Sequence, residues 1–246
     1  QWDREFGIPY VIDIQDPWLN DNYDRPEAPP PPGGWKYRFA RAIASHYEGP
    51  TYHAAQGFVS VSPIYLQTLA KRYPWFASKP QQVIPFGVDI DESSHLVGEP
   101  AFQPQEDTIT LVSIGAVGNI MNKAIHTLCS HLINLRDTRP DLFKQIRVKF
   151  FGTSYAPFPF AKQSVAPIAL NYNLQDTITE STDRIPGAIV RATNQAADGL
   201  LILTSDDPAY TPSKLAGSFI ANRPVLLVTD SASQSAKINQ ELGLAQ

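Results

Sequence analysis

The segment 211–214 (TPSK) combines the residue types that are best suited to bind an anion. It follows the apolar run 199–203, which is typical of a buried strand, and a threonine followed by a proline favours a helix that begins at Pro212. A helix N-terminus presents unpaired N–H groups that attract phosphate, and Ser213 and Lys214 would add a hydroxyl group and a positive charge. The segment therefore predicts a phosphate site at the carboxyl end of a strand. An ordinary capped helix with a solvated lysine would explain the same residues.

A second candidate is the glycine-containing turn that follows the predicted strand 108–114. Gly115 and Gly118 would let the backbone approach a ligand closely, and Asn119 and Lys123 follow shortly after them. The turn matches neither the dinucleotide-binding glycine motif nor a P-loop, because the residues that those motifs require are absent. A plain connection between a strand and a helix stays open as the alternative.

Asp16 is the candidate catalytic group. It follows the predicted strand 10–14, at the edge where open parallel sheets bind ligands, and it would position or deprotonate an acceptor hydroxyl group. Asp13 lies inside the same apolar strand, where a carboxylate needs a partner. An Asx turn before Pro17 is the structural alternative for Asp16.

Composition and the remaining reactive residue types exclude several classes of function. The five histidines lack metal-ligand spacing, and Cys129 lies on an apolar helix stripe that predicts a core position. A single cysteine fits a reducing compartment. The net charge of −4 leaves no broad basic face for nucleic acid. No apolar run approaches the roughly 18 residues that a membrane-spanning helix needs.

The elements that must position these residues alternate between β-rich runs and helical periodicity, which indicates an α/β fold with mostly parallel sheets. Strands are predicted at residues 10–14, 57–62, 82–86, 108–114, 146–151, 199–203 and 225–228. Helices are predicted around residues 66–73, 125–133, 185–196 and 212–221. The sequence therefore predicts two Rossmann-like domains, residues 1–88 and 108–246, joined by an acidic linker at residues 89–107.

Three segments, taken in this order, resemble the GT-B glycosyltransferases, in particular the family-4-like group. YVIDIQDPW (residues 10–18) is similar to a late strand of their N-terminal domain, and residues 57–89 are similar to the stretch that closes that domain. TPSKLAGSFIANRPVLLV (residues 211–228) is similar to their donor-site helix and the strand after it. The resemblance implies a two-domain enzyme of which this chain is the middle and C-terminal part, with the N-terminal domain incomplete.

The resemblance also implies transfer of a sugar from a nucleotide-diphosphate sugar to an acceptor hydroxyl group, without a metal or cofactor and with retention at the anomeric carbon. Lys214 and Lys123 resemble the basic residues that hold the donor diphosphate, and Gly115 resembles the glycine beneath the donor. Thr211 and Ser213 belong to the same diphosphate site. The sugar or nucleotide is expected near Gly118, Asn119, Gly152, Thr153 and Tyr210.

Two departures from the family pattern leave alternatives open. Ala116 stands where many members have an arginine, and Ala209 and Gly217 stand in place of the paired donor-site glutamates. These differences favour a non-catalytic GT-B-like partner subunit that binds nucleotide or carbohydrate. A two-lobed solute-binding protein, which shows the same α/β alternation, is a further alternative.

The resemblance finally implies the partners and the setting. The expected donor is a UDP-, GDP- or ADP-linked sugar, and the expected acceptor is a carbohydrate or a lipid-linked sugar. Nucleic acid is not expected as a partner. The setting implied is bacterial polysaccharide biosynthesis in the cytoplasm, with peripheral contact at the inner face of the membrane.

Overall fold

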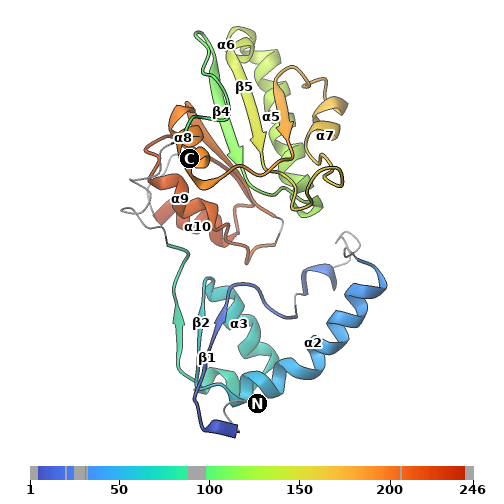
Figure 1. Ribbon diagram of the computed structural model, residues 1–246, viewed down its shortest axis with the longest axis vertical. Helices are drawn as coiled ribbons and strands as arrows, with labels where there is room; N and C mark the ends of the chain where they lie inside the picture. The colour runs from blue at the N-terminus through green and yellow to red at the C-terminus, as the bar shows by residue number, and fades with distance from the viewer. Residues whose placement is uncertain are drawn as a thin grey trace. The chain divides into compact units, whose positions relative to one another are not determined.

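The computed structural model describes residues 5–19, 21–24, 31, 33–87, 98–205 and 207–241. The chain divides into two compact units, Gln1–Phe86 (unit 1) and Gly87–Gln246 (unit 2), each with its own sheet (Figure 1). Every pairing between the described strands is parallel, as the alternation of strands and helices predicts.

Unit 1 is built on a three-stranded sheet in the order β1-β2-β3. Its strands are β1 (Val11–Ile14), β2 (Gly57–Ser60) and β3 (Gln81–Val83), its α-helices are α2 (Trp35–Ala54) and α3 (Pro63–Arg72), and its 3-10 helices are η1 (Asp21–Asp24) and η2 (Pro74–Ser78). Its core is aromatic. The ring of Phe58 packs against Tyr52 and Phe76 at centroid distances of 5.6 Å and 4.3 Å, and all three side chains are buried.

The sequence predictions contain no helix at α2, although it is the longest helix of the described residues. The reason is that its buried side carries polar and charged groups, including Glu48 and Arg41, so no apolar stripe marks the inward face. Gly49 and Pro50 in its last turns also disfavour a helix prediction.

Glu48 of α2 is fully buried and holds unit 1 together through three donors. Its carboxylate accepts hydrogen bonds from Arg72 Nη1 at 2.7 Å, from Tyr73 Oη at 3.1 Å and from the Leu19 backbone N–H at 3.0 Å. Arg72 also pairs with Asp21 at 2.8 Å. The network therefore ties α2 and α3 to the segment that follows β1.

Unit 2 is a five-stranded parallel sheet in the order β6-β5-β4-β7-β8. The strands are β4 (Ile109–Ile114), β5 (Ile146–Phe151), β6 (Ile178–Ser181), β7 (Gly199–Leu203) and β8 (Val225–Val228). The helices are η3 (Asn119–Met121), α5 (Asn122–Thr138), α6 (Pro140–Gln145), α7 (Ala166–Asn171), α8 (Gly187–Ala196), α9 (Lys214–Phe219) and α10 (Gln234–Glu241). The sequence predictions missed β6, α6, α7 and α10, which are short and carry little periodicity.

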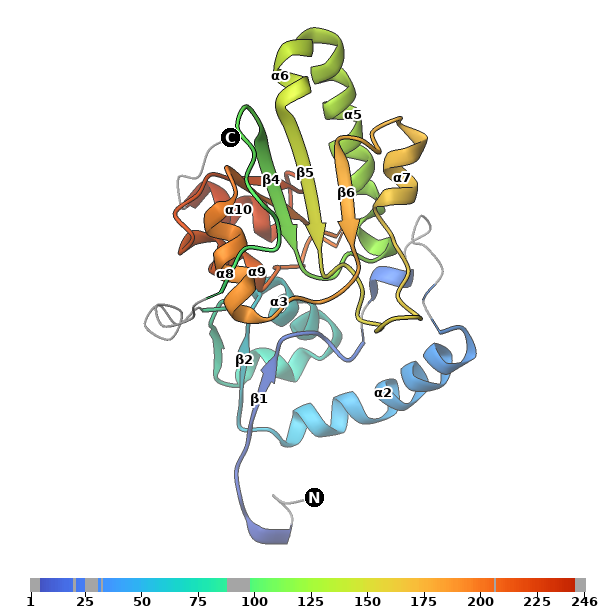
Figure 2. The same ribbon diagram turned by 45° about the horizontal axis from the view of Figure 1, so that its top comes forward.

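Helices cover both faces of this sheet (Figure 2). On one face α5 and α7 pack against alternate residues of β5 and β7, and this cluster includes the predicted core residue Cys129, which is buried. On the other face α8 contacts β4, α9 contacts β7, and Phe102 packs beside Val112 and Leu200. The apolar strand residues therefore point alternately to two separate helix layers.

Of the predicted linker at residues 89–107, residues 89–97 lie outside the described residues. Its described part packs on unit 2, because Ala101 donates a backbone hydrogen bond of 2.9 Å to Thr193 Oγ1 of α8 and Phe102 is buried. Among the described residues, no helix combines the length and the apolar composition needed to cross a bilayer.

We expect Glu48→Ala to lower the free energy of unfolding of unit 1 by about 3 kcal/mol, because it leaves the Arg72 guanidinium partly buried with one carboxylate partner fewer. Urea unfolding measures the loss. Asp141→Ala is the control, since the Asp141 side chain is 95% exposed and its ion pair with Lys144 is at the surface. Equal unfolding midpoints for the two variants would contradict a stabilising role for Glu48.

Candidate anion-binding site

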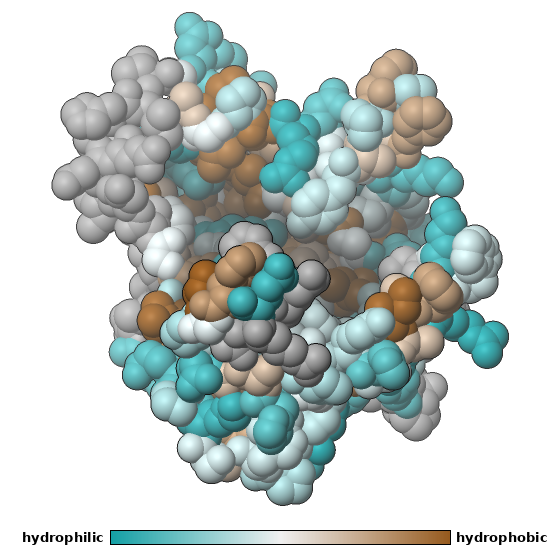
Figure 3. All heavy atoms as spheres, turned by 60° about the horizontal axis from the view of Figure 1, so that its bottom comes forward, coloured by the Kyte–Doolittle hydropathy of each residue, from teal (hydrophilic) through white to brown (hydrophobic). Residues whose placement is uncertain are grey.

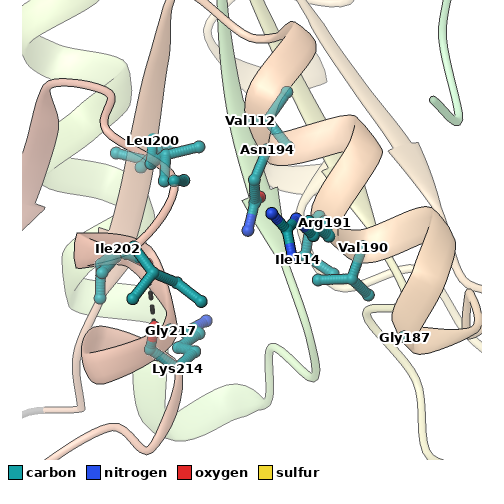
Figure 4. Close-up of a pocket in the computed structure, with 14 residues that line it drawn as sticks. Val112, Ile114, Gly187, Val190, Arg191, Asn194, Leu200, Ile202, Lys214 and Gly217 are labelled. Carbon is teal, nitrogen blue, oxygen red and sulfur yellow. Dashed lines mark hydrogen bonds between the residues drawn. The ribbon is translucent and has the colours of Figure 1, made fainter. Parts of the chain in front are cut away.

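A cavity of about 230 Å³ lies in unit 2 between α8, α9 and the sheet face that these helices cover. Its volume is several times the roughly 30 Å³ that one water molecule occupies in the liquid. Its apolar lining comes from β4 and β7 and from Val190, Ile220 and Ala221, whereas α8 and α9 contribute the polar groups. The lining residues labelled in Figure 4 are Val112, Ile114, Gly187, Val190, Arg191, Asn194, Leu200, Ile202, Lys214 and Gly217.

Two cationic side chains line this cavity without a partner. Lys214 is half-buried as a residue, but its Nζ atom is shielded from solvent, and so is Arg191 Nη1. Neither atom makes a hydrogen bond, and neither side chain forms an ion pair with any carboxylate of the described residues. Figure 4 shows the two side chains extending towards one another, Lys214 from α9 and Arg191 from α8.

Burial lowers the pKa of the Lys214 ammonium from 10.5 to about 8, because the charged form loses its hydration and no carboxylate replaces it. A buried charge is normally paired or neutralised by a ligand. Two such cations on one cavity are therefore the arrangement expected of an anion site, where charge-assisted hydrogen bonds to a phosphate or carboxylate would satisfy both.

The glycine turns predicted for the site lie beside Lys214. Gly115, directly after β4, has a φ of +113°, and Gly152, directly after β5, has a φ of +68°, which are values that glycine adopts readily. A Cβ atom on Gly115 would lie 3.9 Å from Lys214 Cδ, and one on Gly152 would lie 3.9 Å from the Gly115 backbone N. The structure therefore brings Gly115, Gly152 and Lys214 together.

The predicted start of the donor-site helix is wrong by two residues. α9 begins at Lys214 and not at Pro212, and the Leu215 N–H donates to the Pro212 carbonyl at 3.0 Å in the turn that precedes it. Thr211 is not the cap, since its Oγ1 is buried without a hydrogen bond, and Ser213 at the N-cap position is exposed and makes no side-chain cap. The helix ends at Phe219, two residues before the predicted end.

Lys123 does not line the cavity of Lys214. It lies in the first turn of α5 with its side chain 72% exposed, and its Nζ is 3.9 Å from Asp230 Oδ2. It borders a second cavity of about 340 Å³, beside Thr204 of the β7 end and Thr229 of the β8 end. The two lysines that the family resemblance brings to one diphosphate therefore border different cavities.

Three other predicted residues do not line the cavity of Lys214 and belong to the loops around it. Gly118 and Asn119 are exposed at the start of η3, where the Met121 N–H donates to the Gly118 carbonyl at 2.9 Å. Tyr210 is half-buried, and its carbonyl accepts a hydrogen bond of 2.9 Å from Ser235 Oγ of α10. These contacts hold the loops around the carboxyl ends of β4 and β7.

Thr153 belongs to a structural cluster centred on Glu180, which the sequence predictions missed. Thr153 Oγ1 donates to Glu180 Oε1 at 2.6 Å, and the N–H groups of Ser164, Val165 and Ala166 donate to the same carboxylate at 2.7–3.0 Å. Ser164 Oγ also donates to the Val117 carbonyl at 2.7 Å. Glu180 thus accepts hydrogen bonds from the N–H groups at the start of α7 and connects this helix to the turns after β4 and β5.

The aspartates predicted for unit 1 lie at the end of β1. Asp13 is exposed, contrary to the expectation of a buried carboxylate, because it shares the exposed side of β1 with Val11, while Ile14 points to the buried side. Its Oδ2 accepts a hydrogen bond of 2.9 Å from Gln15 Nε2. Asp16 is also exposed, in the bend that directly follows the strand.

Arg191 is the functional candidate that the sequence predictions missed. It lies on the predicted helix 185–196, but only the three-dimensional structure places its guanidinium opposite Lys214. A lone arginine on an amphipathic helix carries no sequence signal for a site. Among the residues that the structure describes, no three His, Cys, Asp or Glu side chains are grouped so that they could hold a metal ion.

Solved structures match this chain over nearly its whole length. Sucrose-phosphate synthase from Thermosynechococcus elongatus aligns with 98% of the chain at 15% identity and a TM-score of 0.55. The N-terminal domain of trehalose-6-phosphate phosphatase from Candida albicans aligns with 100% at 14% identity and a TM-score of 0.62. A UDP-forming trehalose-phosphate synthase from Burkholderia xenovorans, in complex with glucose-6-phosphate, aligns with 95% at 9% identity and a TM-score of 0.62.

The fold is that of the GT-B glycosyltransferases. The sequence prediction of the fold class is therefore confirmed. The chain spans 60%, 60% and 56% of the lengths of the three structures. No protein-family model matches the sequence, and a search of curated proteins gives no match either.

We expect Lys214→Met to raise the free energy of unfolding at pH 7 by about 1–3 kcal/mol, because methionine has a similar length and removes a buried, unpaired charge. At pH 7 the wild-type lysine is protonated in both states, so its penalty is fully present. As the pH rises from about 8 to 10.5, the native state releases the proton before the unfolded state does. The stability difference between variant and wild type should therefore shrink over this range.

Urea unfolding at several pH values measures this effect. Lys144→Met is the matched control, because the Lys144 side chain is 74% exposed at the surface of the same unit. A Lys214→Met variant less stable than wild type at pH 7 would show that the ammonium group has stabilising partners, and would contradict the site.

Proposed function

We propose that the chain is part of a glycosyltransferase and that the cavity between α8 and α9 binds the diphosphate of a nucleotide sugar. The observation that supports this most directly is the pair of cations, Lys214 Nζ and Arg191 Nη1, buried without a counter-charge on one cavity. A diphosphate supplies two adjacent anionic groups and would neutralise both cations at once.

In this proposal the same cations assist the reaction. Negative charge develops on the diphosphate as the bond to the sugar breaks, and fixed donors aimed at that charge stabilise the transition state. Lys214 and Arg191 would do so without a metal ion. We further propose that the sugar is transferred with retention at the anomeric carbon, as the family resemblance implies.

Arg191 compensates for the residue that the first turn lacks. Ala116 stands where many related enzymes have an arginine, and the Lys123 side chain is exposed beside Asp230. Arg191 would provide the second positive charge from α8. The diphosphate would then be held from two helices on one face of the sheet, rather than from the turn after β4.

The proposed donor and acceptor follow from the fold and its relatives. One structural relative is named as a UDP-forming synthase, which supports a nucleoside-diphosphate sugar as donor. The acceptor would be a hydroxyl group of a carbohydrate or lipid-linked sugar, with Asp16 of unit 1 as the candidate that positions or deprotonates it. The setting we propose is polysaccharide biosynthesis in the cytoplasm.

A second candidate function is binding without catalysis. Ala209 and Gly217 replace the two donor-site glutamates of the related enzymes. Gly217 lines the cavity, and a Cβ atom there would have open space around it. The space that a carboxylate would occupy is present while the carboxylate is missing, which favours a partner subunit that binds the nucleotide but does not transfer sugar.

We expect one of UDP, GDP and ADP to bind the wild-type chain in calorimetric titration with EDTA present. Lys214→Met and Arg191→Met should each weaken that binding by about ten- to a hundredfold, the loss expected from one charge-assisted hydrogen bond. Lys144→Met should leave it unchanged. Failure of all three nucleotides to bind the folded wild-type chain would overturn the proposed donor site. Binding without sugar transfer would support the partner-subunit function.

The affinity should also depend on pH in a defined direction. Only the protonated lysine attracts the diphosphate, and in the free protein the pKa of Lys214 is about 8. Binding should therefore be strongest below about pH 8 and weaken as the pH rises above it, whereas proton uptake should accompany binding near pH 8. Titrations in two buffers of different ionisation enthalpy measure the uptake. Affinity that is constant from pH 7 to 9 would contradict a role for the Lys214 ammonium.

A further inference from the structure

The cavity between α8 and α9 has apolar walls, which a diphosphate bound to its two cations does not explain. These walls include Val112 and Ile114 of β4, Leu200 and Ile202 of β7, and Val190 of α8. In Figure 4 the side chains of Ile202 and Val190 reach towards the cavity from opposite sides. A phosphate group next to such walls loses hydration without gaining a hydrogen-bond partner, so this part of the cavity suits an apolar group.

The cavity offers few hydrogen-bonding side chains besides its two cations. Among the residues that the structure describes, the other polar side chains in its lining are Asn194 and Ser218. The Ser218 hydroxyl group already donates to the Lys214 carbonyl at 2.9 Å. A nucleobase carries several donors and acceptors along its edge, and leaving them unpaired in an apolar cavity is unfavourable. The lining therefore suits a ligand in which only an anionic head needs polar partners.

Gly217 keeps part of this cavity open. It lies in α9 and lines the cavity, and a Cβ atom added to it would meet no other atom within 4 Å. A larger residue at position 217 would therefore take up volume that a ligand otherwise uses.

Apolar side chains that are exposed elsewhere do not surround a common space in this way. On the face shown in Figure 3, hydrophobic residues, coloured brown, lie among hydrophilic ones. Apolar residues scattered over a surface are normal and need no ligand. The apolar walls of the cavity differ, because they come from two strands and from α8 around one space of about 230 Å³.

We propose that this cavity also binds a small amphipathic anion, a monocarboxylate with an unbranched alkyl chain, which excludes the nucleotide from the same cations. The carboxylate would accept hydrogen bonds from Lys214 Nζ and Arg191 Nη1, while the alkyl chain packs between the two strands and α8. One negative charge costs less to bring into an apolar cavity than the several charges of a diphosphate. The competition rests on the proposed function, whereas the binding of the carboxylate does not.

Calorimetric titration of the wild-type chain with hexanoate, octanoate and decanoate tests the carboxylate site. Each methylene group that becomes buried should strengthen binding about fourfold, until the chain fills the cavity. The neutral alcohol 1-octanol should bind at least about tenfold more weakly than octanoate, because it lacks the charge that pairs with the two cations. Affinity that does not rise from hexanoate to octanoate would contradict the apolar part of the site.

Variants separate the two parts of the site. Gly217→Leu should remove the gain in affinity from hexanoate to decanoate, because the new side chain occupies the space of the longer chains, and leucine is the better helix former. Lys214→Met and Arg191→Met should each weaken octanoate binding by at least about tenfold. Lys144→Met is the control and should bind as wild type does, since its side chain is 74% exposed. Circular dichroism checks that every variant is folded.

Titration of UDP, GDP and ADP in the presence of octanoate measures the competition. Octanoate should raise the apparent dissociation constant of the nucleotide that binds, in proportion to its own concentration. Nucleotide affinity that octanoate leaves unchanged would overturn the exclusion. Uridine, guanosine or adenosine binding more tightly than octanoate would assign the apolar walls to a nucleobase and overturn the proposal.

The outcomes also distinguish this inference from the proposed function. A folded wild-type chain that binds a nucleotide but none of the three carboxylates would overturn the inference and leave the donor site in place. A chain that binds the carboxylates with the expected dependence on chain length, but none of the nucleotides, would overturn the donor site and support the carboxylate site.

Discussion

A positive charge that is removed from water needs a negative partner, and unit 2 shields two unpaired cationic groups on one cavity. The Lys214 ammonium is held against the sheet by α9, and burial lowers its pKa to about 8. The cost is on the order of 3 kcal/mol for a shift of this size, which is a large part of the 5–15 kcal/mol that stabilises an ordinary domain. The Arg191 guanidinium meets the same cavity from α8.

Two carboxylates, the buried Glu48 and the half-buried Glu180, show how the chain pairs charges with its own donors. Glu48 accepts hydrogen bonds from Arg72, Tyr73 and a backbone N–H group. Glu180 accepts bonds from Thr153 and three consecutive N–H groups at the start of α7. Both carboxylates are therefore paired with donors of the protein, as structural polar groups normally are. Lys214 Nζ and Arg191 Nη1 have no such partner among the described residues, which supports the proposed anion site.

The sequence was sufficient for the repeating part of the fold. β7 and β8 were predicted with the bounds that they have, because both are continuous apolar runs, although only β7 is buried along its whole length. The sequence was insufficient to predict elements whose inward side is held by polar contacts. The inward side of α2 is fixed by Glu48 and its partners, which periodicity does not detect. Lys214 was predicted from its local motif, whereas Arg191 is recognisable only once α8 is folded opposite α9.

Lys123 and Lys214 border different cavities, which changes how a diphosphate could be held. If both lysines met one diphosphate, the anion would bridge the start of α5 and the start of α9. Instead Lys123 borders a different cavity beside Asp230, whose carboxylate would repel an anion. Arg191 and Lys214 share one cavity without a competing carboxylate, so the positive potential is concentrated there. An anion could then be held without an arginine in the turn after β4, because the Arg191 guanidinium of α8 meets the same cavity as Lys214.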